Sequence, residues 1–254
     1  MNDGPQHDVR PHRSLEVLVV DLTRAHKALD AAERATPRLS DDQRTRFDDM
    51  TRRGNKDAAL WRIAHIALRI ALERFAGIGI REVAYAIDPG GRPRLAAADG
   101  LMPCPHFNLS HTGGYALIAV SHAGPVGIDL EVERTLSISS DRRQRIEAAA
   151  VRLLPDQLLP TAPDARFLQA WVRLEAAAKA SGQGIGQILT EAGVIAGAGS
   201  ARGMQALSIH PVRDLMMPSG FYAAIAGAEC QQILAIENFP TDAAALREFL
   251  QVAT

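Results

Sequence analysis

Cysteine is scarce in this chain, which has only Cys104 and Cys230 among its 254 residues. The two positions are far apart in sequence and have no metal-ligand spacing. This excludes a disulfide framework and a cysteine-based zinc site. We therefore expect a reduced, cytoplasmic protein without structural disulfides.

The chain also lacks an excess of charge of one sign, since 28 Lys and Arg residues face 29 Asp and Glu residues for a net charge of −1. This balance excludes electrostatic binding of nucleic acid or of an anionic membrane by the net charge of the whole protein. No apolar run approaches the ~18 residues of a membrane span. Because residues 1–13 are polar, we expect a disordered tail there and no secretory signal.

The stretch His106–Glu133 has the pattern of three short strands. Apolar and polar residues alternate at its start, Gly113-Gly114 marks a turn, and Tyr115–Val120 is a nearly continuous apolar run. Such a run is typical of a strand that is covered on both faces. Gly124-Pro125 marks the second turn and leads into the third strand.

The third strand carries two acidic residues on one face. Asp129 and Glu131 are two positions apart, so their side chains leave the same face ~7 Å apart at the backbone. Two such carboxylates repel each other unless a cation lies between them, and hard oxygen ligands suit Mg²⁺. The alternative is the solvated face of an edge strand. The wholly apolar opposite face, with Val126, Ile128 and Leu130, instead indicates a core element.

Residues 164–185 have the pattern of a long helix, with Asp164 as the expected N-cap and Gly182 near its end. On a helical wheel centred on Trp171, Glu175 falls at about +40° within the apolar arc, and Lys179 at about +80° on its rim. A carboxylate in the buried arc is costly unless it is paired or binds a cation. A simple i,i+4 surface pair is the alternative, and the position on the packed side argues against it.

A basic run precedes another long amphipathic helix, which we expect to end near Phe75. Within this run, Arg53 and Lys56 lie where free N–H groups and the helix dipole favour an anion. A solvated helix end is the alternative interpretation. Upstream, Leu15–Leu22 is a strand candidate, and Ser40 is the expected N-cap of a short helix.

The remaining elements give a doubled order of strands and helices. We expect strands at 191–196, 204–210, 221–226 and 231–237, then a final helix at 242–252. The predicted fold class is α+β with two pseudo-duplicated α/β halves, 14–124 and 125–254. Each half would be a small antiparallel sheet packed by a long helix, with the active site in the cleft between the halves.

Four segments, taken in order, resemble the motifs of the 4′-phosphopantetheinyl transferases, in particular the pseudodimeric, surfactin-synthetase-activating type. The segments are Gly91-Arg92-Pro93, Phe107-Asn108-Leu109-Ser110-His111-Thr112, Gly127-Ile128-Asp129-Leu130-Glu131, and Trp171 with Glu175, Lys179 and Gly182.

This resemblance implies a reaction and its partners. The enzyme would move 4′-phosphopantetheine from coenzyme A to a serine of an apo acyl or peptidyl carrier protein, releasing adenosine 3′,5′-bisphosphate. It implies that Asp129, Glu131 and Glu175 hold Mg²⁺ and that Glu175 accepts the proton of the attacking serine. The two halves within one chain suggest a working monomer.

The resemblance also implies contacts to coenzyme A. Lys179 would stabilise the departing phosphate, His111 would hydrogen-bond the diphosphate, and Ser110 would lie at the nucleotide. Arg92 keeps the charge at a position where the family often has lysine. The residues expected to bind the 3′-phosphate are Arg53 and Lys56.

The sequence departs from the family at two positions. Leu174 replaces a common lysine, and Gln157 lies where many members have a glutamate. Two alternatives stay open: a catalytically silent module that binds coenzyme A or a carrier protein, and another Mg²⁺-dependent phosphoryl enzyme. A serine hydrolase is disfavoured, because Ser110 and His111 are adjacent on a strand and so point to opposite faces.

Overall fold

The computed structural model describes residues 14–76, 85–87, 93–95, 105–195, 201–232 and 236–251. The expected tail at residues 1–13, Arg92 and Cys104 lie outside the described residues. The helices are α1 Leu22–Ala35, α2 Asp41–Arg52, α3 Ala58–Ala76, α4 Ser140–Leu153, α5 Pro163–Ser181, α6 Ile185–Glu191, α7 Ala201–Leu207 and α8 Ala243–Gln251. The strands are β1 Leu15–Asp21, β2 Tyr85–Ile87, β3 Pro93–Leu95, β4 His106–Thr112, β5 Tyr115–Ser121, β6 Val126–Val132, β7 Val212–Asp214, β8 Phe221–Gly227 and β9 Glu237–Asn238.

Two main sheets organise these strands. The first has the order β4-β5-β1-β9, and the second has the order β6-β8-β7. Every pairing is antiparallel except that of β1 with β9, which is parallel. The first sheet is therefore not wholly antiparallel, unlike the sheet that we predicted. The fold class, α+β, is as predicted.

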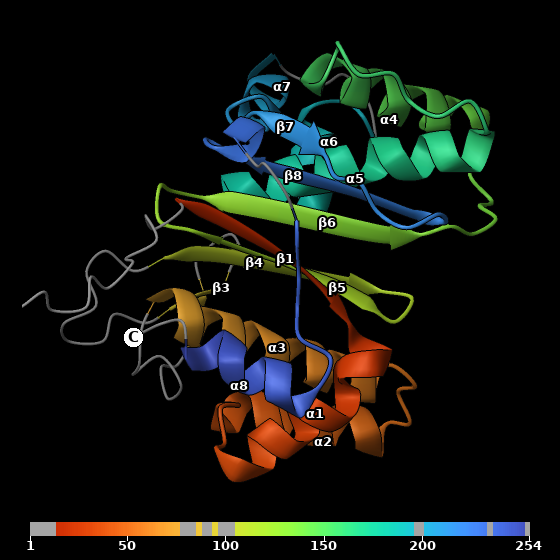
Figure 1. Cartoon of the computed structure of the whole chain (residues 1–254). Helices are drawn as coiled ribbons and strands as arrows, with labels where there is room; N and C mark the ends of the chain where they lie inside the picture. The colour runs from red at the N-terminus through yellow and green to blue at the C-terminus, as the bar shows by residue number, and fades with distance from the viewer. Residues whose placement is uncertain are drawn as a thin grey trace, which may run out of the picture.

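The two sheets face each other, and helices cover their outer sides (Figure 1). Helices α1, α2, α3 and α8 lie with the first sheet, whereas α4, α5, α6 and α7 lie with the second. Of the described helices, none combines the length and the apolar character that a membrane span requires.

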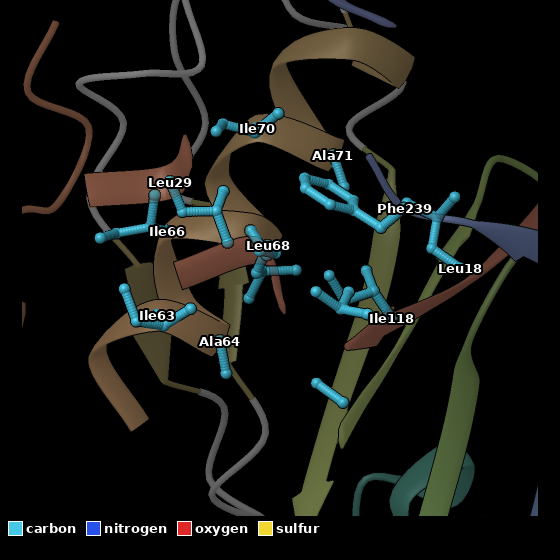
Figure 2. Packing of buried hydrophobic residues seen from close by; sticks show 14 of the residues in the cluster. Leu18, Leu29, Ile63, Ala64, Ile66, Leu68, Ile70, Ala71, Ile118 and Phe239 are labelled. Atoms are coloured by element: carbon cyan, nitrogen blue, oxygen red, sulfur yellow. The ribbon is translucent and has the colours of Figure 1, made fainter. Parts of the chain in front are cut away.

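Three apolar clusters fill the spaces between these layers. The first joins α3 to the first sheet, and Figure 2 shows Ile63, Ile70 and Phe239 within it. The second joins α4 and α5 to the outer side of the second sheet. The third lies between the two sheets and includes Leu117 of β5 and Ile128 of β6. Burial of apolar surface on both sides of each sheet is the main force that stabilises this arrangement.

Local sequence signals set several helix ends as expected. Ser40 caps α2: its hydroxyl accepts a hydrogen bond from the Gln43 backbone N–H, and the Gln43 side-chain oxygen accepts one from the Ser40 backbone N–H. Gly182 ends α5 in the left-handed conformation with φ of 71°. At the other end of α5 the prediction was wrong. Pro163 is the first helical residue, and Asp164 pairs with Arg143 instead of acting as the cap.

Three strand predictions in the second half of the chain were also wrong. Within the predicted strand 231–237, Gln231 and Gln232 lie in a 3₁₀ helix, residues 233–235 lie outside the described residues, and β9 begins only at Glu237. Residues 191–195 form the end of α6 and a turn, and residues 201–207 form α7. Both segments are short and apolar, so periodicity does not separate a strand from a buried helix. Gly203 lets α7 pack closely against the end of α6, because a Cβ at this position would lie 2.4 Å from the backbone carbonyl carbon of Glu191.

The end of the described chain returns to the first sheet. Strand β9 pairs with β1, and Phe239 and Phe249 contribute to the same apolar cluster as α3. The segment 237–251 therefore packs with the sheet that contains β1, β4 and β5. The division of the chain at residue 125 remains a prediction.

Gly127 allows α5 to lie directly against β6. A Cβ at this position would lie 2.1 Å from the Ala176 carbonyl oxygen and 2.4 Å from the Ala180 amide nitrogen. Both are backbone atoms of α5, so no side-chain rotation could relieve the contact. The absence of a side chain at Gly127 thus sets the distance between β6 and α5.

We predict that Gly127→Ala lowers the free energy of unfolding by about 3 kcal/mol, because overpacking at a backbone contact separates α5 from β6. Urea unfolding followed by circular dichroism measures this change. Gly186→Ala is the matched control, since a Cβ there meets nothing within 4 Å. In helix α6 that substitution should instead stabilise by about 0.5–1 kcal/mol. Equal effects of the two substitutions would contradict the packing argument.

Candidate functional site

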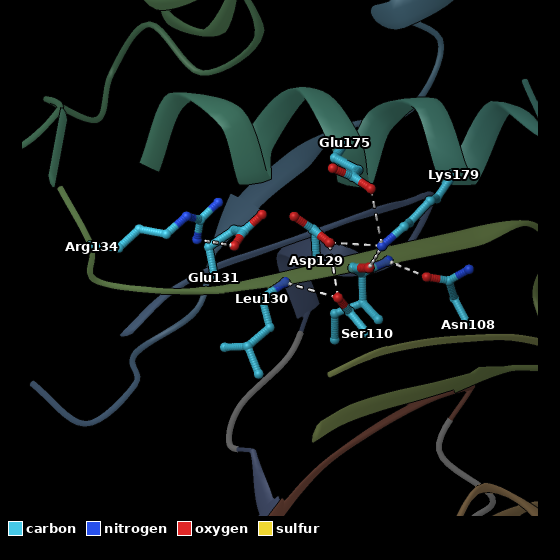
Figure 3. Close-up of polar contacts among 9 residues, drawn as sticks. Asn108, Ser110, Asp129, Leu130, Glu131, Arg134, Glu175 and Lys179 are labelled. Atoms are coloured by element: carbon cyan, nitrogen blue, oxygen red, sulfur yellow. Dashed lines mark hydrogen bonds and ion pairs between the residues drawn. The ribbon is translucent and has the colours of Figure 1, made fainter. Parts of the chain in front are cut away.

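The acidic residues of β6 and α5 converge at the contact that Gly127 permits. Asp129, Glu131 and Glu175 each offer an oxygen atom, and these atoms all lie within 4.8 Å of one another (Figure 3). Two come from the strand and one from the helix, as the alternation and the wheel predict. Three carboxylates at this separation form a donor set suited to a hard divalent cation.

Lys179 lies one helical turn beyond Glu175 and reaches the same group. Its Nζ donates hydrogen bonds to Asp129 Oδ1 at 2.7 Å and to the Ile128 carbonyl oxygen at 3.1 Å. The Nζ is 3.7 Å from Glu175 Oε1. The i,i+4 pair is therefore part of a partly buried network with β6, which a simple surface pair would not be.

Asp129 uses only one of its two carboxylate oxygens within the described residues. Oδ1 accepts hydrogen bonds from Lys179 and, at 2.9 Å, from the Ser110 hydroxyl. Oδ2 is buried and has no hydrogen-bond partner there. A buried anionic oxygen without a partner is costly, so the residues present fit a cation at this position.

The surroundings of Glu175 shift the pKa of its carboxyl group. Burial raises the pKa of Glu175 above its usual value, and the nearby Asp129 carboxylate raises it further, while Lys179 opposes the increase. Glu131 is paired with Arg134 on its other side. Three carboxylates and two cations leave an excess of one negative charge at the group.

A cavity of approximately 550 Å³ opens beside this acidic group. Lys179, Asn108 and His111 line the side of the cavity nearest to β6 and α5. The other walls come from the start of α2, the first half of α3, β2, β3 and the end of α5. Lys179 therefore contacts the carboxylates and also borders the cavity.

The far wall of the cavity contains aromatic and basic side chains that sequence reasoning missed. The Trp61 and His65 rings contact each other at a tilt of 30° with centroids 3.9 Å apart, and the Arg46 guanidinium lies over the Trp61 ring at 5.2 Å. Burial lowers the pKa of His65 to about 4, so its ring is neutral near pH 7. The i,i+4 spacing of Trp61 and His65 was the available signal, but such pairs are also common in cores.

His111 borders the cavity, and its expected hydrogen bond to the diphosphate stays a prediction. Burial lowers the pKa of His111, the charge of Lys179 lowers it further, and Asp57 opposes both effects. The ring is therefore neutral near pH 7. A neutral imidazole has one N–H donor and one acceptor nitrogen, so it can donate one hydrogen bond to an anionic ligand.

The structure does not bring all of the predicted ligand contacts to the cavity. Arg53 and Lys56 are exposed, and neither is among the described residues that line it. Ser110 is buried, and its hydroxyl bonds Asp129. Leu174 is fully buried in the cluster under α5. Gln157 accepts a hydrogen bond from Arg173 through its backbone carbonyl.

Comparison with curated proteins finds relatives of this chain. No family model matches the chain. The chain is 29% identical over 147 residues to slr0495 of Synechocystis sp., a provisionally named 4′-phosphopantetheinyl transferase, with 58% of each protein covered. It is 33% identical over 128 residues to the 4′-phosphopantetheinyl transferase HetI of Nostoc sp., which covers 48% of this chain and 51% of that relative.

The alignments thus span about half the length of the curated relatives that the chain matches. These similarities confirm the predicted resemblance to the 4′-phosphopantetheinyl transferase superfamily. They support a transferase as the general class of protein.

We predict that Mg²⁺ stabilises the protein through the three carboxylates. At about 100 times its dissociation constant, a ligand of the folded state adds about 2.7 kcal/mol. For a chain of this size that corresponds to a rise in Tm of about 5–10 °C. Differential scanning fluorimetry in Mg²⁺ and in chelator measures the rise.

The double variant Glu131→Gln/Glu175→Gln should lose most of this rise, because amide oxygens carry no net charge. Asp156→Asn removes an exposed carboxylate outside the group and serves as the control. A full rise in Tm in the double variant would contradict the assignment of the metal site.

Proposed function

We propose that this chain is a 4′-phosphopantetheinyl transferase of the pseudodimeric type, with coenzyme A and an apo acyl or peptidyl carrier protein as its substrates. The main support for this proposal is that carboxylate oxygens of three residues from β6 and α5 lie within 4.8 Å of one another, beside a cavity bordered by Lys179 and His111. The similarity to two 4′-phosphopantetheinyl transferases supports the same assignment.

In this proposal the acidic group and the cavity have separate tasks. Mg²⁺ held by Asp129, Glu131 and Glu175 would offset the charge that builds on the leaving phosphate. The cavity takes the nucleotide part of coenzyme A, because the Trp61 ring suits a base and the Arg46 and Lys179 side chains suit phosphates. Lys179 borders both, so its ammonium group can stabilise the departing phosphate.

The carrier serine must lose its proton as it attacks the diphosphate. Glu175 lies next to both Asp129 and Lys179, and Lys179 borders the cavity. Its carboxylate is therefore proposed to accept this proton, directly or through water. His111 donates a hydrogen bond to the diphosphate from the β4 side.

The architecture supports the pseudodimeric type as part of the proposal. One face of the three adjacent strands β4, β5 and β1 packs against α3, and the second sheet packs against α5. Both long helices have 19 residues. The proposed substrate site lies where the two sheet-and-helix units meet, and the protein is proposed to act as a cytoplasmic monomer.

A catalytically silent module that binds coenzyme A or a carrier protein is the alternative. The buried Asp129 Oδ2 without a partner among the described residues favours the enzyme, since a carboxylate oxygen of this kind can serve as a ligand of a catalytic cation.

We predict that an apo carrier protein incubated with the chain, coenzyme A and Mg²⁺ gains the mass of one phosphopantetheine group. Glu175→Gln should lower the turnover number about 10²- to 10⁴-fold, the usual effect of losing an acid–base group. Intact-protein mass spectrometry over time measures both. Asp156→Asn is the control. Binding of coenzyme A without any gain of mass across several carriers would instead support the silent module.

We further predict that the 3′-phosphate extends out of the cavity to Arg53 and Lys56, which lie outside its described lining, whereas Arg46 binds the part of the nucleotide inside the cavity. Loss of a charged hydrogen bond costs about 1.5–3 kcal/mol. Arg53→Ala/Lys56→Ala should therefore raise the KM for coenzyme A about tenfold or more and leave the KM for 3′-dephospho-coenzyme A unchanged. Arg46→Ala should raise both values.

Initial-rate kinetics with the two substrates separates these roles. Equal increases of the two KM values in the Arg53→Ala/Lys56→Ala variant would remove these residues from the 3′-phosphate site. The cavity wall that contains Arg46 would then be the better assignment.

A further inference from the structure

Strands β4 and β6 lie side by side without belonging to one sheet. Each is the first strand in the order of its own sheet. Two side chains of β4 bridge the strands: Asn108 Oδ1 accepts a hydrogen bond from the Ile128 amide at 3.0 Å, and Ser110 Oγ accepts one from the Leu130 amide at 3.2 Å. Side chains here satisfy buried amides that a backbone ladder satisfies elsewhere.

Asn108 and Ser110 differ in one respect. Both are buried, at 7% and 9% exposure, and both hold the β6 backbone. Ser110 also donates its hydroxyl hydrogen to Asp129 Oδ1 at 2.9 Å. Since Asn108 contacts the amide of the residue before Asp129, the two bonds flank the same carboxylate, and only Ser110 touches it.

The Ser110 hydroxyl fixes which oxygen of Asp129 remains available. With Ser110 and Lys179 both on Oδ1, the carboxylate cannot rotate without breaking two hydrogen bonds. Figure 3 shows the other oxygen of Asp129 on the side of Glu131. That oxygen, Oδ2, is buried and has no hydrogen-bond partner within the described residues.

We propose that Ser110 is a positioning residue for the metal site, which holds the Asp129 carboxylate so that Oδ2 points at the divalent cation. The proposal rests on the acidic group of the proposed function and assigns to Ser110 a role other than a nucleotide contact. A hydrogen bond to a metal-ligating carboxylate orients that ligand before the ion binds, and its loss typically weakens metal binding 10- to 100-fold.

The test is Mg²⁺ binding to the full-length chain, measured by isothermal titration calorimetry without coenzyme A or carrier protein. Ser110→Ala should raise the Mg²⁺ dissociation constant at least about tenfold. Ser110→Thr keeps the hydroxyl and should restore the dissociation constant to within about threefold of the original value. Mn²⁺ binding followed by electron paramagnetic resonance provides the same comparison at lower concentrations.

Asn108→Ala is the matched control, because it removes the neighbouring bridge to β6 and leaves Asp129 untouched. If Ser110 only joins the strands, Asn108→Ala and Ser110→Ala will weaken Mg²⁺ binding equally, and the proposal is overturned. If Ser110 positions Asp129, Asn108→Ala will change the dissociation constant less than about twofold, while urea unfolding shows similar destabilisation of both variants.

Ser110→Cys covers the case in which Ser110→Ala does not fold, since a thiol nearly preserves the volume but donates weakly. It should also weaken Mg²⁺ binding, and an unchanged dissociation constant in that variant would overturn the proposal. The mass-spectrometric assay of phosphopantetheine transfer is independent of this measurement of Mg²⁺ binding. If Mg²⁺ binds the Ser110 variants as tightly as it binds the wild type, the positioning role alone is refuted. If Mg²⁺ binding depends on Ser110 but no phosphopantetheine is transferred, only the proposed function is refuted.

Discussion

The direct contact between helix α5 and strand β6 is the constraint on which the site depends. It exists because Gly127 has no side chain, so the α5 backbone at Ala176 and Ala180 can lie where a Cβ would otherwise be. At this separation Glu175 and Lys179 reach the level of Asp129. A wider separation would leave the strand carboxylates facing a gap and would remove the helix carboxylate from the group.

Charge is distributed unevenly across this contact. The acidic group keeps an excess of negative charge and one buried oxygen without a partner in the described part of the chain, which favours a cation. Among the described residues that line the adjoining cavity, Lys179 and Arg46 face one carboxylate, Asp42, and this balance favours an anion. A divalent ion and a phosphorylated ligand would each reduce the repulsion that the other meets. This complementarity is the physical basis of the proposed function.

The contact between β4 and β6, where the two sheets meet, contributes both to the stability of the fold and to the geometry of the site. Asn108 and Ser110 replace backbone hydrogen bonds between β4 and β6, and the apolar cluster between the sheets packs beside them. Buried amides that lacked these acceptors would destabilise the fold. Ser110 bonds both the β6 backbone and the Asp129 side chain. The position of one sheet relative to the other therefore affects the orientation of a proposed metal ligand.

The sequence by itself determined the local features. Alternation placed Asp129 and Glu131 on one face of a strand, and helical periodicity placed Glu175 on the packed side of α5, because both patterns depend only on backbone geometry. Short apolar segments such as α7 were assigned wrongly, since their pattern fits either kind of element. Only the tertiary structure decided that Ser110 bonds Asp129, that Arg46 and Trp61 line the cavity, and that β9 joins the first sheet. These contacts join residues far apart in the chain, and their geometry is set by packing, which no local pattern encodes.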